Sequence, residues 1–63
     1  MSFHWLIETN NGGLYYREDC WTFDACRAYF FDTFTQANEY IINHNMIDCK
    51  ATEHGFDDNL TVV

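Results

Sequence analysis

Apolar and polar residues alternate along the first segment of the chain. Residues 3–8 place Phe3, Trp5 and Ile7 on one face of an extended strand, with mixed residues on the other face. The Asn11-Gly12 pair follows, and Asn-Gly is a strong hairpin signal because both turn positions can take a positive φ. Residues 14–17 then form the return strand, so this part of the sequence predicts a β-hairpin.

The next stretch loses the alternation and then becomes rich in aromatic residues. Residues 18–26 are predicted to form a loop with one helical turn capped by Asp24, whose carboxylate can accept a backbone N–H. Residues 27–31 contain Tyr29, Phe30 and Phe31 and are predicted to form a third strand. This run indicates burial on both faces, or one face left for a partner.

Helical spacing begins after this strand. Thr33 and Gln36 match a capping box, in which each side chain satisfies a backbone N–H near the other residue. We expect a helix over residues 34–44, with Ala37 and Ile41 on its apolar stripe. Asn45, just past the end, suits a left-handed C-cap.

Alternation returns after the helix and completes the predicted fold. Residues 46–52 place Ile47, Cys49 and Ala51 on one side of a last strand. The order β-β-β-α-β predicts an α+β fold: a small antiparallel sheet of three to four strands with one helix packed on one face. We expect a single domain over residues 1–56 and a loose acidic tail over residues 57–63.

Acidic and aromatic residues are both abundant in this chain. The formal net charge is −7, from 10 acidic and 3 basic residues, and the aromatic residues are 6 Phe, 4 Tyr and 2 Trp. Acid-rich chains with few aromatic residues stay disordered, whereas aromatic side chains bury enough surface to fold. We therefore expect a folded domain with a negative surface. At 63 residues a homodimer interface could supply part of its stability.

The same features limit the expected partners and location. A negative field disfavours direct binding to nucleic acid or to anionic membranes. There is no apolar run of about 20 residues and no basic N-terminal leader, so we expect a cytoplasmic protein. Three cysteines are an odd number, and in the cytosol they are expected to be reduced, partly buried small side chains.

Motifs for catalysis and metal binding are lacking. Cys20 and Cys26 are too far apart in sequence for a zinc knuckle, so neither a metal nor a cofactor is expected. The sequence has no nucleophile elbow, phosphate-binding glycine loop or His-Glu-x-x-His. Glu53 and His54 are adjacent in sequence and would point to opposite faces of a strand. We therefore do not expect an enzyme.

The sequence resembles a group of small bacteriophage-encoded proteins in three short motifs. These are Trp21-Thr22-x-Asp24, then Phe31-Asp32-Thr33 leading into Ala37 and Ile41, then Thr52-Glu53-His54. The resemblance covers most of residues 3–56, and the chain departs from the pattern at Phe23, Cys26 and the acidic tail. It implies a phage origin and expression inside a bacterium, without implying catalytic residues.

Acidity and this resemblance together predict a protein-binding role. We expect a phage accessory protein that binds and inhibits a bacterial host protein, of anti-CRISPR or anti-restriction type, by occluding a basic nucleic-acid-binding surface. Carboxylates two residues apart on one strand face lie about 6.6 Å apart, comparable with the phosphate spacing of DNA. The expected contacts are exposed aromatic anchors and steering carboxylates: Tyr15, Tyr16, Trp21, Glu18, Asp19, Asp57 and Asp58.

Two other interpretations fit the same residues. One is a small structural module that self-associates through the aromatic segment 27–31. In the other, the negative charge has no role in binding, because a net charge of −7 also keeps a small domain soluble.

Overall fold

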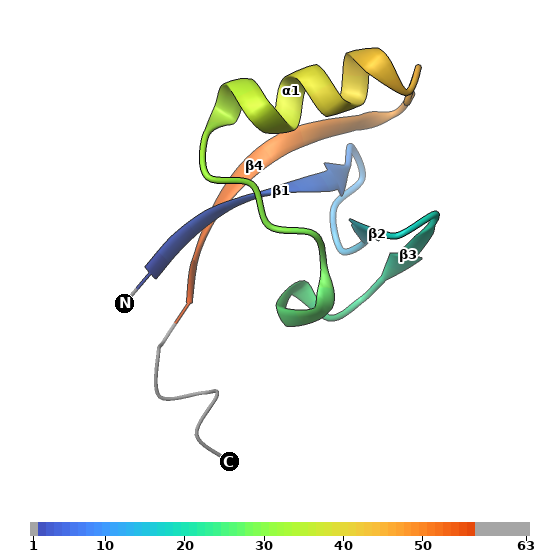
Figure 1. Ribbon diagram of the computed structural model, residues 1–63. Coiled ribbons are helices and arrows are strands. Elements are labelled where there is room, and N and C mark those ends of the chain that lie inside the picture. Colours follow the sequence, from blue (N-terminus) through green and yellow to red (C-terminus); the bar gives the residue numbers. More distant parts are fainter. Residues whose placement is uncertain (1, 57–63) are drawn as a thin grey trace.

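The computed structural model describes residues 2–56, which form one antiparallel sheet and one α-helix. The strand order in the sheet is β3-β2-β1-β4. The elements are β1 (Ser2–Thr9), β2 (Tyr15–Arg17), β3 (Cys20–Thr22), the 3-10 turn η1 (Ala25–Arg27), α1 (Phe34–Asn43) and β4 (Cys49–Phe56). Helix α1 lies over β1 and β4 (Figure 1), which confirms the predicted α+β class with a helix on one face of the sheet. The expected tail, 57–63, lies outside the described residues.

Strand β1 is the centre of the fold. It pairs with β4 along its whole length, from Ser2 opposite Phe56 to Thr9 opposite Cys49. Leu6 and Ile7 are both fully buried, and because neighbouring strand residues point to opposite faces, both faces of β1 are covered. The predicted assignment of Ile7 to one face and Leu6 to the other is therefore consistent with the structure.

The hairpin between β1 and β2 is confirmed, but its turn differs from the prediction. Gly12 and Gly13 take positive φ values of 81° and 89°, whereas Asn11 does not. Thr9 N–H donates to the Leu14 carbonyl at 3.0 Å, which closes the loop. The chain reverses at two consecutive glycines because they reach this region without a Cβ penalty.

The predicted third strand over residues 27–31 is wrong. The third strand is β3, which pairs with β2 through a two-residue turn. Residues 25–27 form η1 instead, and Asp24 caps it as predicted, with Cys26 N–H donating to Asp24 Oδ1 at 2.9 Å. Two residues of this segment still reach the sheet: Tyr29 N–H donates to the Tyr16 carbonyl at 3.1 Å, and Phe31 exchanges two 2.8 Å backbone hydrogen bonds with Trp5.

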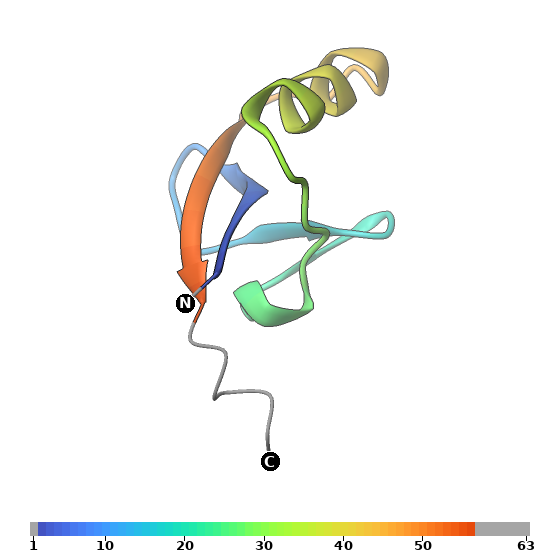
Figure 2. The same ribbon diagram turned by 60° about the vertical axis from the view of Figure 1, so that its left-hand side comes forward.

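This rearrangement follows from the short contact between β1 and β2. The two strands share a single residue pair, Glu8 with Tyr15. Farther along β1, the backbone groups of Trp5 need other partners, because unpaired buried backbone groups are costly. Phe31 supplies those partners. Figure 2 shows the β2–β3 hairpin extending away from the β1–β4 pair.

Helix α1 is bounded by the caps that the sequence indicates. Thr33 Oγ1 accepts from Gln36 N–H at 3.2 Å, and Gln36 Oε1 accepts from Asp32 N–H at 3.0 Å, one residue earlier than in a standard capping box. At the other end Asn45 takes φ 53°, as predicted for a left-handed cap. Met46 N–H donates to the Ile41 carbonyl at 3.0 Å, which completes a Schellman motif and ends the helix at Asn43.

Strand β4 starts and ends later than predicted. Asn45 and Asp48 both have left-handed φ values, 53° and 58°, so the intervening residues form a loop. Ile47, expected within the strand, is 79% exposed in this loop. The Asp48 carbonyl accepts from Asn10 N–H at 2.9 Å, which ties the loop to the β1–β2 turn.

The main core lies between α1 and the sheet. Ile7, Tyr16 and Ala37 are its buried members. Partly buried residues from every nearby element pack around them: Trp5, Tyr29, Phe31, Tyr40, Ile41, Met46, Cys49 and Ala51. Helix α1 is too short and too polar to cross a membrane, and the described part of the chain contains no other α-helix.

Candidate functional site

The β2–β3 hairpin carries two carboxylates at its tip. Arg17 pairs with Cys20, so Glu18 and Asp19 form the turn between the strands. Both are exposed, and Asp19 takes a left-handed φ of 57°. Asp tolerates this region better than most residues, because its short polar side chain can form local hydrogen bonds. The turn therefore presents acidic side chains in a fixed backbone conformation.

Tyr16 fixes the position of Asp19 from inside the core. Asp19 N–H donates to the Tyr16 hydroxyl at 3.2 Å, and the same hydroxyl lies 3.4 Å from Asp19 Oδ1. The Tyr40 hydroxyl on α1 lies 3.2 Å from the Tyr16 hydroxyl. Its hydrogen bond to Tyr16, followed by burial, raises the pKa of Tyr40 to about 12. Tyr40 therefore stays protonated and links the helix to the acidic turn.

The carboxylates of the turn also act on Tyr29, a tyrosine packed in the core. Burial, and after it the negative charge of Glu18, raises the pKa of Tyr29. Asp19 acts in the same direction, and the opposing effect of Arg17 is smaller. At Tyr29 the carboxylates of the turn therefore add to the effect of burial in spite of the neighbouring arginine.

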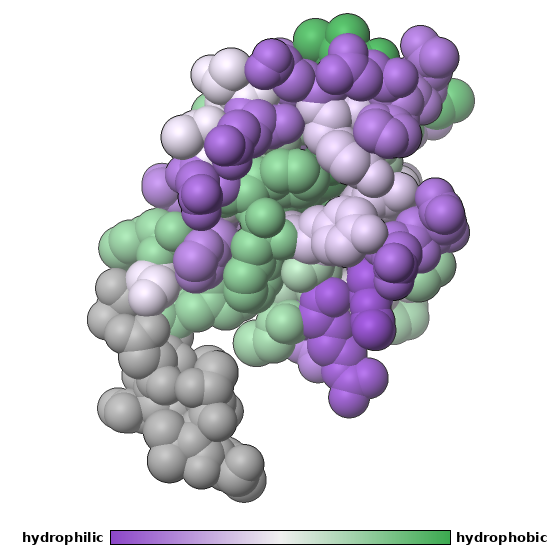
Figure 3. Space-filling view, in the orientation of Figure 1, coloured by the Kyte–Doolittle hydropathy of each residue, from purple (hydrophilic) through white to green (hydrophobic). Residues whose placement is uncertain are grey.

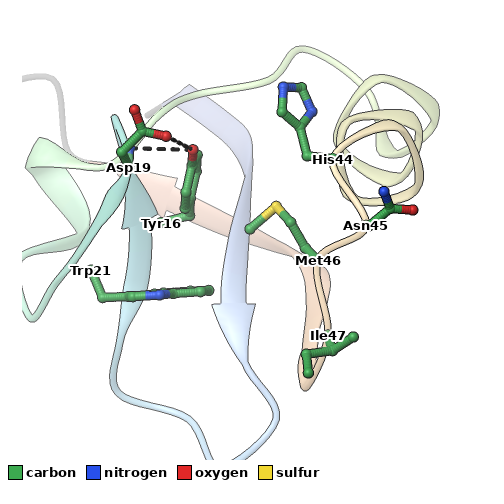
Figure 4. A pocket seen from close by; sticks show the side chains of 7 residues that line it. All are labelled: Tyr16, Asp19, Trp21, His44, Asn45, Met46 and Ile47. Carbon is green, nitrogen blue, oxygen red and sulfur yellow. Dashed lines mark hydrogen bonds between the residues drawn. The ribbon is translucent and has the colours of Figure 1, made fainter.

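A groove of about 410 Å³ lies between this hairpin and the loop that follows α1. The hairpin contributes Tyr16, Asp19 and Trp21 to one wall (Figure 4). Residues 44–47 of the loop form the other wall. This volume lies within the range of small-ligand sites, and it is large enough to admit a side chain of a partner.

The loop wall of the groove combines polar and apolar groups. The His44 ring stacks on Tyr40 at 3.9 Å between centroids, and its Nδ1 lies 3.0 Å from the Tyr40 carbonyl oxygen. A carbonyl oxygen only accepts, so Nδ1 carries the proton and Nε2 is the acceptor of the neutral ring. Met46 and the highly exposed Ile47 supply apolar surface.

The structure brings several of the predicted partner-binding residues together and corrects one of them. Trp21 is 40% exposed beside the acidic turn, as an anchor requires, and Tyr15 is half-buried. Tyr16 is only 8% exposed, so its expected exposure is wrong. Its ring packs against three other aromatic rings, so Tyr16 supports the turn from the core instead of contacting a partner directly. The predicted residues Asp57 and Asp58 lie outside the described residues.

Carboxylates surround the domain but do not form a ladder along a strand. Among residues 2–56 every carboxylate residue is exposed except Glu8. No strand in this range places two carboxylates on one face, because β1 and β4 carry one each and the short strands carry none. The predicted regular spacing along a strand is therefore wrong. Figure 3 shows hydrophilic residues spread over α1 and hydrophobic residues exposed below it.

A polar cluster on the opposite face of the sheet was not predicted. Glu8 Oε1 accepts from Thr52 Oγ1 at 3.0 Å and lies 3.5 Å from His54 Nε2. That same nitrogen lies 2.8 Å from Thr52 Oγ1. No local pattern indicates this cluster, because only the β1–β4 register brings residues 8 and 54 together.

The geometry of this cluster is that of a structural network. A catalytic triad uses the two imidazole nitrogens for different partners, one for the nucleophile and one for the carboxylate. Here Glu8 and Thr52 both meet Nε2 of His54, and Tyr15 packs its ring edge-on against the imidazole. The contacts join β1 to β4 without setting up a general base for the threonine hydroxyl.

The cysteines are dispersed in the fold. Cys49 is half-buried against the core as expected, but Cys20 and Cys26 are exposed, so their expected burial is wrong. Burial, and after it the charge of Asp48, raises the pKa of Cys49. Within residues 2–56 no three His, Cys, Asp or Glu side chains are grouped so that they could hold a metal ion.

Comparison with known proteins gives no relative from which a function can be transferred. No family model, no curated protein and no solved structure matches the chain. We therefore identify the β2–β3 hairpin and its groove as the candidate functional site from their geometry and chemistry alone.

Proposed function

We propose that this chain is an accessory protein of bacteriophage type that binds and inhibits a bacterial host protein by occluding a basic nucleic-acid-binding surface. The observation that supports this most is the acidic turn beside a half-exposed tryptophan. Glu18 and Asp19 lie next to Trp21, so charge and an aromatic anchor occupy one surface. Interfaces obtain affinity from such anchors and association rate from complementary charge.

The remaining carboxylates extend the negative field around the domain. Asp32 lies just before α1 and Glu39 lies on it. Asp48 lies just before β4 and Glu53 lies on it. The chain has three basic residues against ten acidic ones, and one of the three, Arg27, pairs with Asp24 at 3.5 Å. A basic nucleic-acid groove is the class of host surface that such a field attracts. Inhibition would be steric and electrostatic, without a covalent step.

Competition for nucleic acid tests this proposal directly. A basic host protein captured at low salt is loaded with its labelled DNA or RNA, and this chain is then added. We expect displacement of the nucleic acid and a decrease of about tenfold or more in the association rate when salt rises from 50 to 200 mM. Retention of the nucleic acid in the complex, or a rate insensitive to salt, would contradict the proposal.

A pair of charge-neutral variants separates local contact from the overall field. Glu18→Gln with Asp19→Asn removes two charges at the turn, and Glu39→Gln with Glu53→Gln removes two elsewhere. Both pairs should slow association by a similar factor. Only the first should also speed dissociation, because only those side chains are expected at the interface.

Self-association through segment 27–31 has weaker support. Tyr29 and Phe31 pack into the core, so they are not available to a second copy. Phe30 is 45% exposed, but its ring stacks on His4 at 4.6 Å. Sedimentation velocity over a wide concentration range tests this alternative, which predicts a stable homo-oligomer at low concentration.

A further inference from the structure

We propose that the groove between the β2–β3 hairpin and the loop after α1 binds an arginine side chain of the partner protein. The inference rests on the proposed function, and it assigns the anchoring contact to one place on the surface. The groove combines a carboxylate, an aromatic ring and an apolar wall around one opening, lined by Asp19, Trp21 and Ile47. A guanidinium on a flexible aliphatic stem is complementary to all three.

The carboxylate is preorganised for such a ligand. Asp19 is held through its backbone N–H by Tyr16, and Tyr40 steadies that hydroxyl from the helix. A carboxylate on a fixed backbone loses less entropy when it pairs with a charged donor than one on a mobile loop does. His44 also lines the groove, and its ring is held by the contact between Nδ1 and the Tyr40 carbonyl oxygen.

The aromatic and apolar parts favour arginine over lysine. Trp21 is 40% exposed, and a planar guanidinium can stack on an indole face while pairing with a carboxylate. Ile47 is 79% exposed and has no described role in the core. A large apolar side chain this exposed beside an acidic groove can pack against the methylene stem of a bound arginine.

Charge complementarity identifies the occupant as cationic. Glu18 adjoins Asp19 on one side of the groove, and Asp48 follows Ile47 on the other. Burial is the main cause of the raised pKa of Tyr29, and the charges of Glu18 and Asp19 add to it from the same side. An anionic or purely apolar ligand would meet these carboxylates without compensation.

Small-molecule probes test the groove without knowledge of the host protein. Amide chemical shifts of the labelled protein are followed by NMR while N-acetyl-arginine amide is added. We expect shifts at the Trp21 indole N–H and at residues 44–47, with half-saturation in the millimolar range. N-acetyl-citrulline amide, which has nearly the same shape but no charge, should shift these signals far less.

Matched variants separate the groove from the general negative field. Asp19→Asn keeps a residue that tolerates the left-handed conformation and should weaken arginine binding by about threefold. Ile47→Ser should weaken it without disturbing the fold. Glu39→Gln removes the same charge from α1 and should leave it unchanged. Equal weakening by Asp19→Asn and Glu39→Gln, equal shifts with citrulline, or shifts away from Trp21 would overturn the inference.

The result also distinguishes failure of the groove from failure of the proposed function. If the groove does not bind arginine, a salt-sensitive complex with a basic host protein would still support the proposed function. If arginine binds at Trp21 but no nucleic acid is displaced from any basic host protein, arginine binding by the groove is supported and the proposed inhibitory function is refuted.

Discussion

The Tyr16 hydroxyl joins the core to the acidic turn, so its removal tests the central structural argument. Tyr16→Phe keeps the ring and its aromatic contacts and deletes one oxygen. That oxygen lies 3.2 Å from both the Asp19 nitrogen and the Tyr40 hydroxyl, and 3.4 Å from Asp19 Oδ1. The substitution therefore removes hydrogen bonds with little change in packing.

The expected loss of stability follows from these distances. A net hydrogen bond contributes about 0.5–1.5 kcal/mol, and the 3.4 Å contact is too long to add much. Asp19 is exposed, so its N–H can bind water after the substitution and avoids the full desolvation penalty. Two bonds therefore predict a decrease of about 1–2 kcal/mol in the free energy of unfolding. For a domain this small, that corresponds to a decrease in Tm of roughly 4–16 °C.

Tyr40 provides a second, independent signal. Its hydrogen bond to Tyr16 is the main cause of a pKa of about 12. A tyrosine pKa raised in the folded state contributes stability that is fully present below the ordinary value near 10 and is lost as the pH rises to about 12. In Tyr16→Phe the pKa of Tyr40 should decrease, and the loss of stability over this interval should become smaller.

Thermal unfolding by circular dichroism and alkaline titration of tyrosinate absorbance measure the two effects. Tyr15→Phe is the matched control, since it removes the same atom from a tyrosine whose hydroxyl makes no hydrogen bond within residues 2–56. It should change Tm by only a few degrees. Equal Tm values for the two variants, or an unchanged ionisation step of Tyr40, would refute the role assigned to Tyr16.

Two further predictions concern the helix cap and the thiols. Thr33→Ala removes the acceptor for Gln36 N–H and should lower the free energy of unfolding by about 1 kcal/mol. Thr33→Ser keeps a hydroxyl and should preserve most of this stability. Equal losses in the two variants would show that the hydroxyl does not cap α1. Cys20 and Cys26 are exposed while the pKa of Cys49 is raised by burial, so a thiol reagent at pH 8 should give two fast reactions and one slow one. Three equal rates in the native protein would contradict the placement of Cys49, and the slow rate should disappear in guanidinium chloride.

Local sequence signals predicted the parts of the fold that depend on neighbouring residues. The Thr33 cap, the Asp24 cap and the left-handed Asn45 each involve contacts within five residues along the chain. Alternation likewise located β1. These features could be predicted because their causes are short-range.

The errors arose where distant segments compete for the same backbone groups. Residues 27–31 have strand-like composition, but β3 occupies the outer edge of β2. The segment is left with one backbone hydrogen bond from Tyr29 to Tyr16 and an isolated bridge between Phe31 and Trp5. The Glu8–His54 contact likewise depends on register between strands far apart in sequence. Neither result is encoded in a local pattern, so tertiary pairing decided both.

The acidity and the aromatic content of this chain are coupled at the β2–β3 hairpin. An acidic tail would keep its charge whether or not the domain folded, but Asp19 owes its position to a hydroxyl in the core. If the packing around Tyr16 is lost, Asp19 therefore keeps its charge but is no longer held in one position. It follows that a core substitution that loosens the hairpin should weaken binding of a specific partner more than it weakens salt-dependent attraction, because only specific binding needs the fixed carboxylate.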